Sequence, residues 1–366
     1  MKLYPCRCIA ICYGRAAKPR GDIVLGFCHE CAFIYNIAFD AARLRYNADY
    51  ENSLHFSPRF QAYAENLASR LIRQYDLHEK DIIEIGCGKG DFLALLCKLG
   101  GNRGVGFDPS LVKGKNDNET ADMIFVQDVY SERYSSYKAD FICSRHTLEH
   151  VPHPKEFLTQ VRRAIDGQKQ TVVFFEVPNA LFTLRDLAIW DIIYEHCSYF
   201  SAPAFFRLFA ASGFEVKQIT EIFEGQFLCL EAMPATATAV NSVPHDDLEK
   251  VSQWVVEFPA RYRSKIETWR RKLEQLTESG KRAVVWGAGS KGVTFLNALA
   301  NQIDYVVDIN PRKHHKFVAG TGQKIVPPEF MREYRPAVII VMNPIYLKEI
   351  RQIMASMSMA AETLVV

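Results

Sequence analysis

The clearest structural signal in the chain is the run Asp81-Ile82-Ile83-Glu84-Ile85-Gly86-Cys87-Gly88-Lys89-Gly90. Its apolar first half predicts a buried strand, and its alternating glycines predict a sharp turn before a helix that begins near Asp91. Glycine lets a ligand come close to the backbone, and a helix N-terminus offers free N–H groups and a partial positive charge. The run therefore predicts a site for an anion or a nucleotide, although a tight turn that merely needs glycine has the same pattern.

Strand and helix patterns alternate from this run to residue 232. Helical stretches such as 90–99 and 154–165 lie between the strand candidates, which are 81–85, 103–107, 123–126, 139–143, 171–177, 214–219 and 226–231. Short apolar strands separated by helices predict an α/β fold, in which a doubly wound parallel sheet carries helices on both faces. The last two strands follow each other closely and can close the sheet as an antiparallel edge.

Acidic residues sharpen the nucleotide interpretation. Glu84 lies inside the strand, and the spacing E-x-G-x-G-x-G differs from the G-x-G-x-x-G of dinucleotide sites. Asp108 ends the next strand, where a carboxylate can accept both hydroxyls of a ribose, and Asp128 follows the third strand, where it can meet an adenine amino group. This combination resembles class I S-adenosylmethionine methyltransferases. The resemblance implies S-adenosylmethionine as cofactor, with its methionine part cradled by Gly86, Gly88 and Gly90. A nucleotide-binding domain of another kind is the alternative.

The rest of the chain predicts three further regions. Residues 1–78 form a head with cysteines and a helical lead-in that starts at Ser57 and Pro58. Residues 79–232 form the cofactor-binding domain just described, and residues 233–280 a linker and a helical stretch that Pro259 should kink or end. Residues 281–366 form a second α/β unit, with strands expected at 282–286, 303–308 and 337–342 and a helix at 291–300.

A second glycine turn opens this C-terminal unit. Residues 287–292 read G-x-G-x-x-G after a predicted strand, and Asp308 follows the next strand. Taken alone, this pattern fits a dinucleotide fingerprint, so a second site for NAD or NADP is an open alternative. The helix N-terminus at Lys291 favours an anion on either interpretation.

Two later segments are richer in polar residues than a cofactor fold requires. They are residues 144–152, which contain His146, Glu149 and His150, and residues 191–200, which contain Glu195 and His196. Both follow strands, and ligands of open α/β sheets bind at the carboxyl ends of strands. The spacing H-x-x-E-H also matches an inverted zinc-protease motif. We set that interpretation aside, because nearby prolines end any helix holding both histidines and no third ligand is evident.

Over nearly its whole length the chain resembles sugar C-methyltransferases that act on nucleotide-linked deoxyketosugars. The resemblance rests on Cys28-x-x-Cys31, Tyr50 in DYENS, the Glu-His segment before Ser-Tyr-Phe, and a C-terminal unit with GAGSKG, DINP, GT and MNP. It implies a C-terminal Rossmann-like domain that packs against the cofactor domain and helps hold the nucleotide-sugar diphosphate. The implied substrate-binding residues are Tyr199, Gly287, Gly289, Lys291 and Gly292. The family pattern Tyr-His-Glu-His reads Ile193-Tyr194-Glu195-His196 here, so only Glu195 and His196 carry over.

The chemistry of carbon methylation explains why an active site would contain histidine, glutamate and tyrosine side chains. A base removes the proton next to a ketone, and the enolate carbon attacks the methyl group of the cofactor. A histidine suits the base, and we expect His196 in that role, with Glu195 orienting it. Tyr50 or His146 can hydrogen-bond the developing enolate oxygen. Ordinary packing would also explain each of these residues. An O- or N-methyltransferase, or a protein that binds the cofactor without turnover, remains an alternative.

The N-terminal cysteines and the overall composition complete the expectations. Cys28 and Cys31 have the spacing of half a tetrahedral zinc site, which Cys6 and Cys8 can complete; free thiols are the alternative. With 366 residues, 48% apolar residues and a net charge of +2, the chain predicts a cytoplasmic globular enzyme with a small-molecule substrate. We expect neither a nucleic-acid partner nor a membrane partner, because the charge is small and no apolar run is long enough to span a bilayer.

Overall fold

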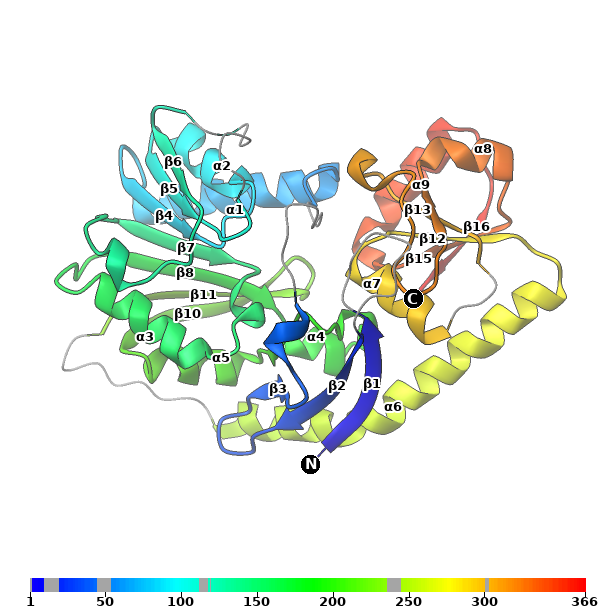
Figure 1. The fold of residues 1–366 in the computed structure, drawn as a ribbon, viewed down its shortest axis with the longest axis horizontal. Coiled ribbons are helices and arrows are strands. Elements are labelled where there is room, and N and C mark those ends of the chain that lie inside the picture. Colours follow the sequence, from blue (N-terminus) through cyan, green and yellow to red (C-terminus); the bar gives the residue numbers. More distant parts are fainter. Residues whose placement is uncertain are drawn as a thin grey trace.

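The computed structural model describes residues 2–9, 20–44, 54–111, 118, 120–235, 245–299 and 303–366, with residues 2–9, 20 and 245–246 described by backbone alone. The strands of these residues form three sheets (Figure 1). A seven-stranded sheet and a five-stranded sheet stand side by side, and a four-stranded N-terminal sheet lies below and between them.

The seven-stranded sheet has the order β10-β11-β8-β7-β4-β5-β6. All neighbours are parallel except β11, which runs antiparallel to both β8 and β10. The predicted doubly wound α/β sheet with an antiparallel edge is therefore confirmed. Its strands are β4 (Asp81–Ile85), β5 (Arg103–Phe107), β6 (Met123–Val126), β7 (Phe141–Arg145), β8 (Val172–Pro178), β10 (Phe214–Ile222) and β11 (Phe227–Pro234).

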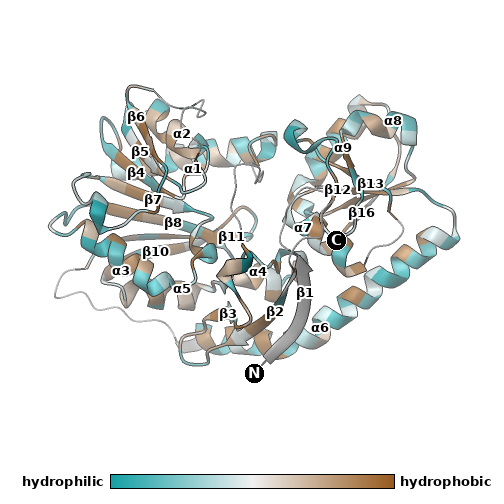
Figure 2. Cartoon of the chain, in the orientation of Figure 1, coloured by the Kyte–Doolittle hydropathy of each residue, from teal (hydrophilic) through white to brown (hydrophobic). Residues whose placement is uncertain are grey.

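Helices cover both faces of this sheet. Successive strand residues point to opposite faces, so Phe174 lies in the core under α1 and α2 while Phe175 lies in the core under α3 and α5. The strands are accordingly apolar, as the brown colouring of Figure 2 shows. The helices are α1 (Pro58–Tyr75), α2 (Asp91–Gly100), α3 (Pro154–Ala164) and α5 (Ala202–Ala210), with the short α4 (Ala180–Leu184) after β8.

The five-stranded C-terminal sheet is parallel throughout, with the order β14-β13-β12-β15-β16. Helix α7 covers one face, and α8 and α9 cover the other. The elements are β12 (Ala283–Trp286), α7 (Ser290–Leu299), β13 (Tyr305–Val307), β14 (Lys324–Val326), α8 (Met331–Tyr334), β15 (Val338–Val341), α9 (Leu347–Ser356) and β16 (Glu362–Val365). The sheet contains the predicted strands and two more, β14 and β16.

The head adds a small antiparallel sheet that the sequence pattern did not indicate. Its strands are β1 (Lys2–Ile9), β2 (Arg20–Phe27), β3 (Ile34–Asn36) and β9 (Ser198–Tyr199). The strand β9 comes from the segment that carries Glu195 and His196. The head therefore holds a segment of the candidate site from below.

One long helix, α6 (His245–Glu278), runs beneath the molecule from the head to the C-terminal sheet (yellow in Figure 1). The expected end at Pro259 was wrong, because α6 continues through that residue for 34 residues in all. Burial of its apolar side, including Val255 and Trp269, in a core shared with β2 and the C-terminal sheet offsets the lost backbone hydrogen bond. Head, helix and C-terminal sheet thus share a single core.

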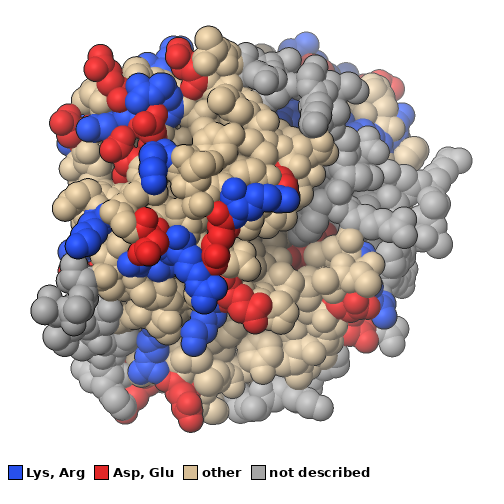
Figure 3. Space-filling view, turned by 60° about the vertical axis from the view of Figure 1, so that its left-hand side comes forward, with Lys and Arg blue, Asp and Glu red and all other residues tan. Residues whose placement is uncertain are grey.

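The described surface carries mixed charge. On the face shown in Figure 3, Lys and Arg side chains alternate with Asp and Glu, as the small net charge implies. No helix in the part of the chain that the structure describes combines the length and the apolarity needed to cross a bilayer.

Candidate active site

The glycine turn after β4 has the conformation that glycine alone adopts without strain. Gly86, Gly88 and Gly90 all have positive φ angles, of 71°, 55° and 76°. A Cβ on Gly86 would lie 2.0 Å from Oγ1 of Thr147, whereas a Cβ on Gly88 would meet nothing within 4 Å. Gly86 is therefore needed for packing, and Gly88 borders open space in which a ligand can approach the backbone.

Asp108 stands beside this open space at the end of β5. Its Oδ2 accepts a 2.9 Å hydrogen bond from the backbone N–H of Gly88, and its Oδ1 accepts from the backbone N–H and the hydroxyl of Ser110. The carboxylate is half-buried. The structure thus brings Asp108 to the glycine turn, where the sequence placed a ribose-binding carboxylate.

Asp128 lies after β6, close to the aromatic cluster behind β5. Its Oδ1 accepts from the backbone N–H of Val129 at 2.7 Å, and its Oδ2 accepts from the Tyr134 hydroxyl at 2.5 Å and from Arg133. The hydrogen bond from Tyr134 holds the pKa of Asp128 below its ordinary value. Asp128 is therefore ionised at neutral pH and held in one orientation.

Glu84 occupies a different place from the other predicted cofactor residues. Its side chain is buried below the turn, and one carboxylate oxygen accepts a 3.0 Å hydrogen bond from the backbone N–H of Leu93 in α2. Burial raises the pKa of Glu84 to about 8, against the opposing effect of Arg145. In this structure Glu84 anchors the start of α2 rather than facing the open side of the turn.

The segment after β7 packs directly on the glycine turn, through the contact between Thr147 and Gly86. His146 precedes Thr147 with a φ of 52°, which is uncommon for a residue with a side chain. Its backbone N–H donates to the carbonyl of Glu176 at 2.9 Å, and its Nε2 lies 2.6 Å from Oε1 of Glu176. The strained backbone aims the imidazole at the end of β8.

Glu176 organises a buried charged cluster that sequence reasoning missed. Arg145 contacts both of its carboxylate oxygens at 3.1 and 3.2 Å, and the Tyr63 hydroxyl donates to it at 2.7 Å. Burial alone would raise the pKa of Glu176, but Arg145 and His146 outweigh burial and hold that pKa well below its ordinary value. The signal was present as charged residues at the ends of apolar strands, in FICSR and VVFFEV.

The Glu195–His196 segment lies against the same edge. The backbone N–H of Cys197 donates to the carbonyl of Glu149 at 3.0 Å, and Nδ1 of His150 lies 2.8 Å from the carbonyl oxygen of Glu195. The rings of His150 and His196 are 4.9 Å apart. Burial, together with His150, holds the pKa of His196 well below its ordinary value, so this imidazole is neutral and can accept a proton.

Glu149 completes this group and was not among the predicted site residues. One carboxylate oxygen of Glu149 and one ring nitrogen each from His150 and His196 lie within 4.8 Å of one another. Burial raises the pKa of Glu149 to about 8 and lowers the pKa of His150 to about 4. The structure therefore brings together both histidine segments, which are 45 residues apart in the chain.

The position of the absent family histidine is filled by Tyr194, which has a structural role. Its hydroxyl accepts from the backbone N–H of Asp40 at 2.9 Å, and its ring packs so closely on Gly21 that a Cβ there would be 2.0 Å away. Tyr199 is also buried, and its hydroxyl donates to the carbonyl of Ile193 at 3.1 Å. Tyr50 lies outside the described residues.

The second glycine turn is built like the first, but its aspartate is buried. Oδ2 of Asp308 accepts from the backbone N–H of Ala288 at 2.8 Å, and Nζ of the buried Lys313 lies 3.5 Å from the same oxygen. A Cβ on Gly292 would lie 1.9 Å from the carbonyl oxygen of Gly287, so Gly292 serves the packing of α7 on the turn. A Cβ on Gly289, by contrast, would meet nothing within 4 Å.

Lys291, at the start of α7, forms an ion pair with Asp191 across 2.5 Å, and both side chains are 15% exposed. Asp191 ends the short 3-10 helix Ile189–Asp191, before the Glu195–His196 segment. In this structure Lys291 therefore joins the C-terminal unit to the candidate site.

The strand register gives no support to the predicted four-cysteine zinc site. The β1–β2 pairing places Cys6 opposite Ile23 and Cys8 opposite Gly21, while Cys28 follows the far end of β2. At about 3.4 Å per residue the two pairs are about 15 Å or more apart, whereas sulfurs that share a zinc ion lie within about 4 Å of each other. Cys28 and Cys31 are free thiols, and among the described residues no third ligand joins them.

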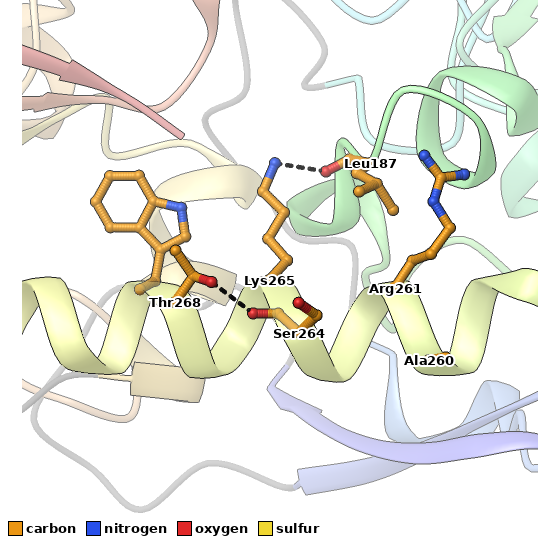
Figure 4. A pocket seen from close by; sticks show the side chains of 7 residues that line it. Leu187, Ala260, Arg261, Ser264, Lys265 and Thr268 are labelled. Atoms are coloured by element: carbon orange, nitrogen blue, oxygen red, sulfur yellow. Dashed lines mark hydrogen bonds between the residues drawn. The ribbon is translucent and has the colours of Figure 1, made fainter.

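A cavity of about 510 Å³ lies elsewhere, between α6 and the chain after α4 (Figure 4). Nζ of Lys265 donates to the carbonyl of Leu187 at 2.8 Å, and Arg261 donates to the carbonyls of Leu184 and Arg185. These cations bind carbonyl groups at the C-terminus of α4, where positive charge is favourable. None of the residues that line this cavity is one of the predicted site residues.

Comparison with known proteins gives matches to both halves of the chain. A family described as "Methyltransferase domain" matches residues 56–219, and one described as "C-methyltransferase C-terminal domain" matches residues 237–366. The C-methyltransferase NovU of Streptomyces niveus is 27% identical over 288 residues, which cover 74% of this chain and 67% of that protein.

Solved structures with the same kind of domain are more distant. An S-adenosylmethionine-dependent methyltransferase from Listeria monocytogenes is 13% identical, with a TM-score of 0.38 over 48% of this chain and 100% of that one. A methyltransferase from Bacillus halodurans is 13% identical, with a TM-score of 0.36 over 46% of this chain and 99% of that one. The two domain matches and the NovU relationship together identify an S-adenosylmethionine-dependent methyltransferase that is a homologue of the C-methyltransferase NovU.

Proposed function

We propose that this enzyme methylates a carbon atom of a nucleotide-linked deoxyketosugar, with His196 as the base. The observation that carries the proposal is the juxtaposition of three segments at one sheet edge. Thr147 packs on Gly86 of the glycine turn, and the bond between Glu149 and Cys197 ties the His196 segment to the same place. These two contacts support a role for His196 as a base that acts near the turn proposed for the methyl donor. The match to a C-methyltransferase C-terminal domain supports carbon as the acceptor atom.

Five residues around the open turn have the chemistry to hold the cofactor. Gly88 leaves room for the methionine part, and Gly86 and Gly90 let the turn pack closely around that space. Asp108 can accept ribose hydroxyls, and Asp128 can accept the adenine amino group. Glu84 would act indirectly, because it fixes the start of α2 under the turn. S-adenosylmethionine, when bound there, supplies an electrophilic methyl group.

His196 would take the proton from the carbon next to the ketone, and the C–H electron pair would become the enolate. The enolate carbon then forms its bond to the methyl group while the carbon–sulfur bond breaks, and the proton stays on His196 until it reaches solvent. His146, which Glu176 holds at 2.6 Å, is placed to hydrogen-bond the enolate oxygen. Glu195 would orient the histidine pair through its carbonyl contact with His150.

The C-terminal unit would hold the nucleotide end of the substrate. Gly289 borders open space, and Gly287 and Gly292 shape the turn at the start of α7, where an anion is favoured. Lys291 would contact the diphosphate from its place opposite Asp191, and Tyr199 would support the pocket from β9. NAD at this turn is disfavoured, because Lys313 already neutralises the carboxylate that a ribose would need.

The proposal is tested with labelled S-adenosylmethionine and a panel of nucleotide-linked ketosugars. We expect label in a carbon-bound methyl group, and we expect His196→Ala to abolish it while S-adenosylhomocysteine still binds. His153→Ala, at an exposed histidine, is the matched control and should retain full turnover. Label on oxygen or nitrogen, or unchanged turnover of His196→Ala, would contradict the proposal.

A further inference from the structure

We propose that Glu149 is a positioning residue that balances the charge of the imidazolium formed when His196 takes the substrate proton. This inference rests on the proposed function of His196 and adds an acidic partner to it. The family pattern offers a histidine two residues before His196, but Tyr194 at that position faces the head. Another group of the protein must therefore balance the charge of protonated His196.

The geometry of Glu149 suits that role. It lies in the 3-10 helix Leu148–His150, its residue is 1% exposed, and its carboxylate lies within 4.8 Å of ring nitrogens of His150 and His196. Its buried Oε2 has no hydrogen-bond partner among the described residues, and its Oε1 is 3.8 Å from Nδ1 of His146. A buried, unpartnered carboxylate oxygen is costly, so its retention among histidines indicates a role in which it gains a partner.

The surrounding charges single out Glu149. Two other buried carboxylates lie at this edge. Glu176 is already engaged by Arg145, Tyr63 and His146. The carboxylate of Glu195 is buried too, but it is not part of the group that Glu149 forms with the ring nitrogens of His150 and His196. Nδ1 of His150 lies 2.8 Å from the carbonyl oxygen of Glu195, which fixes the orientation of this ring beside His196. The groups facing His196 are then the two neighbouring histidines and Lys291, all of which disfavour a positive charge on it. An anion at Glu149 offsets that unfavourable field when the proton arrives.

The same arrangement predicts a pH dependence. Because burial raises the pKa of Glu149 to about 8, the carboxyl group is mostly protonated at pH 7 and becomes an anion above pH 8. Proton removal by His196 should therefore accelerate as pH rises through about 8. The other titratable or charged groups near Glu149 and His196 are His146, His150, Glu176, Glu195 and Lys291.

Deuterium exchange separates proton removal from methyl transfer. In D2O, with S-adenosylhomocysteine in place of the methyl donor, mass spectrometry follows deuterium entering a thymidine-diphosphate-linked 4-keto-6-deoxyhexose. We expect Glu149→Gln to slow exchange about 30- to 100-fold and to flatten its rise near pH 8. Glu149→Asp keeps the charge and should regain part of the rate. Glu156→Gln, at an exposed glutamate of α3, is the matched control and should behave as the wild type.

The outcomes distinguish this inference from the proposed function. No exchange by the wild-type enzyme, or unchanged exchange by His196→Ala, contradicts the proposed base. Loss of exchange in His196→Ala with wild-type rate and pH profile in Glu149→Gln overturns the role of Glu149 alone. Exchange that a chelator abolishes and Zn²⁺ restores would also overturn it, because Glu149, His150 and His196 would then be metal ligands.

A measurement without substrate checks the state of Glu149. A carboxyl group whose pKa is raised on folding contributes stability that is full below pH 4.5 and is lost as pH rises towards 8. Glu149→Gln removes this contribution, so its stability relative to the wild type should increase between pH 5 and pH 9. A difference that stays constant with pH would overturn the inference.

Discussion

The two glycine turns of this enzyme share a backbone-to-aspartate hydrogen bond but differ in how exposed that aspartate is. In each, an N–H of the turn donates to an aspartate 20 residues later, Gly88 to Asp108 and Ala288 to Asp308. At the first turn the aspartate is half-buried and bordered by open space, whereas at the second it is buried against Lys313. One strand–turn–helix frame can thus present a carboxylate to a ligand or neutralise it internally.

The residues that support the two turns from the preceding strand also differ, in polarity. Two positions before the first glycine, Glu84 is a buried carboxyl group that anchors α2, whereas the equivalent residue before Gly287 is the apolar Val285. The first turn therefore rests on a polar support and the second on packing alone. The glycine spacing indicates a strand–turn–helix backbone, and the side chains around the turn determine whether it can bind a ligand.

The largest expected effect follows from removing the buried aspartate of the second turn. Asp308→Ala leaves the Lys313 ammonium buried without its partner, and we expect a loss of about 3–5 kcal/mol in the free energy of unfolding. Asp108→Ala should cost less, about 1 kcal/mol, because Asp108 is half-buried and forms no ion pair with any described residue. Urea denaturation can be followed by tryptophan fluorescence, since all four tryptophans lie in the head core and C-terminal core: Trp190, Trp254, Trp269 and Trp286. Equal losses would remove the distinction between the turns.

The next effect concerns ligand access at the open turn. Gly88→Ala places a methyl group in the space where the cofactor is proposed, so we expect S-adenosylhomocysteine to bind about 100-fold more weakly, or about 2.7 kcal/mol. Gly101→Ala is the matched control, because Gly101 also has a positive φ and open space but lies at the far end of α2. Isothermal titration calorimetry measures both affinities. A similar loss in both variants would point to backbone strain as the cause.

A smaller effect tests the polar support of the first turn. Glu84 has a pKa raised to about 8, so it contributes stability below pH 4.5 that is lost as pH rises towards 8. Glu84→Gln keeps an acceptor for the N–H of Leu93 but cannot ionise, and we expect it to be about 2 kcal/mol more stable than the wild type at pH 9. Thermal unfolding at several pH values checks this. An unchanged difference from pH 5 to pH 9 would contradict it.

The smallest expected effect concerns the ion pair that links the C-terminal unit to the candidate site. Lys291→Met removes the ion pair with Asp191, which is partly exposed, so we expect a loss of about 1 kcal/mol and unchanged affinity for S-adenosylhomocysteine. If Lys291 also contacts the substrate diphosphate, the KM for the nucleotide sugar rises in this variant. Asp191→Asn is the control, because it breaks the ion pair and leaves the cation. The same KM in both variants would leave Lys291 with a structural role only.

Local patterns account for what the sequence predicted well. Ser57 and Pro58 mark the start of α1, and the strand and turn at 81–90 follow directly from apolar and glycine spacing. Asp108 was placed at the turn because carboxyl ends of parallel strands meet at one edge. These features depend on neighbours in the chain or on the topology of the sheet.

Features that depend on distant partners were missed. Glu176 is defined by Arg145, Tyr63 and His146, and its pairing with Tyr63 spans 113 residues. Pro259 suggested a helix end because the burial that holds α6 together comes from β2 and the C-terminal sheet. The cysteine spacing left a zinc site and free thiols both open because spacing says nothing about strand register, and the register places the two cysteine pairs far apart along β2.

Helix α1 begins on a residue from the end of the chain. The Ser57 hydroxyl accepts from the N–H of Phe60 and donates to the carboxylate of Glu349 at 2.6 Å, and the N–H of Arg59 donates to the same oxygen. Glu349 is synthesised 292 residues after Ser57, which takes about 15 to 60 s at typical translation rates. During that time Ser57 can cap α1, but its hydroxyl and the N–H of Arg59 lack this carboxylate as acceptor. The start of the helix that carries Tyr63, the hydrogen-bond partner of Glu176, therefore gains its last contacts only after the C-terminal unit has been synthesised and has docked.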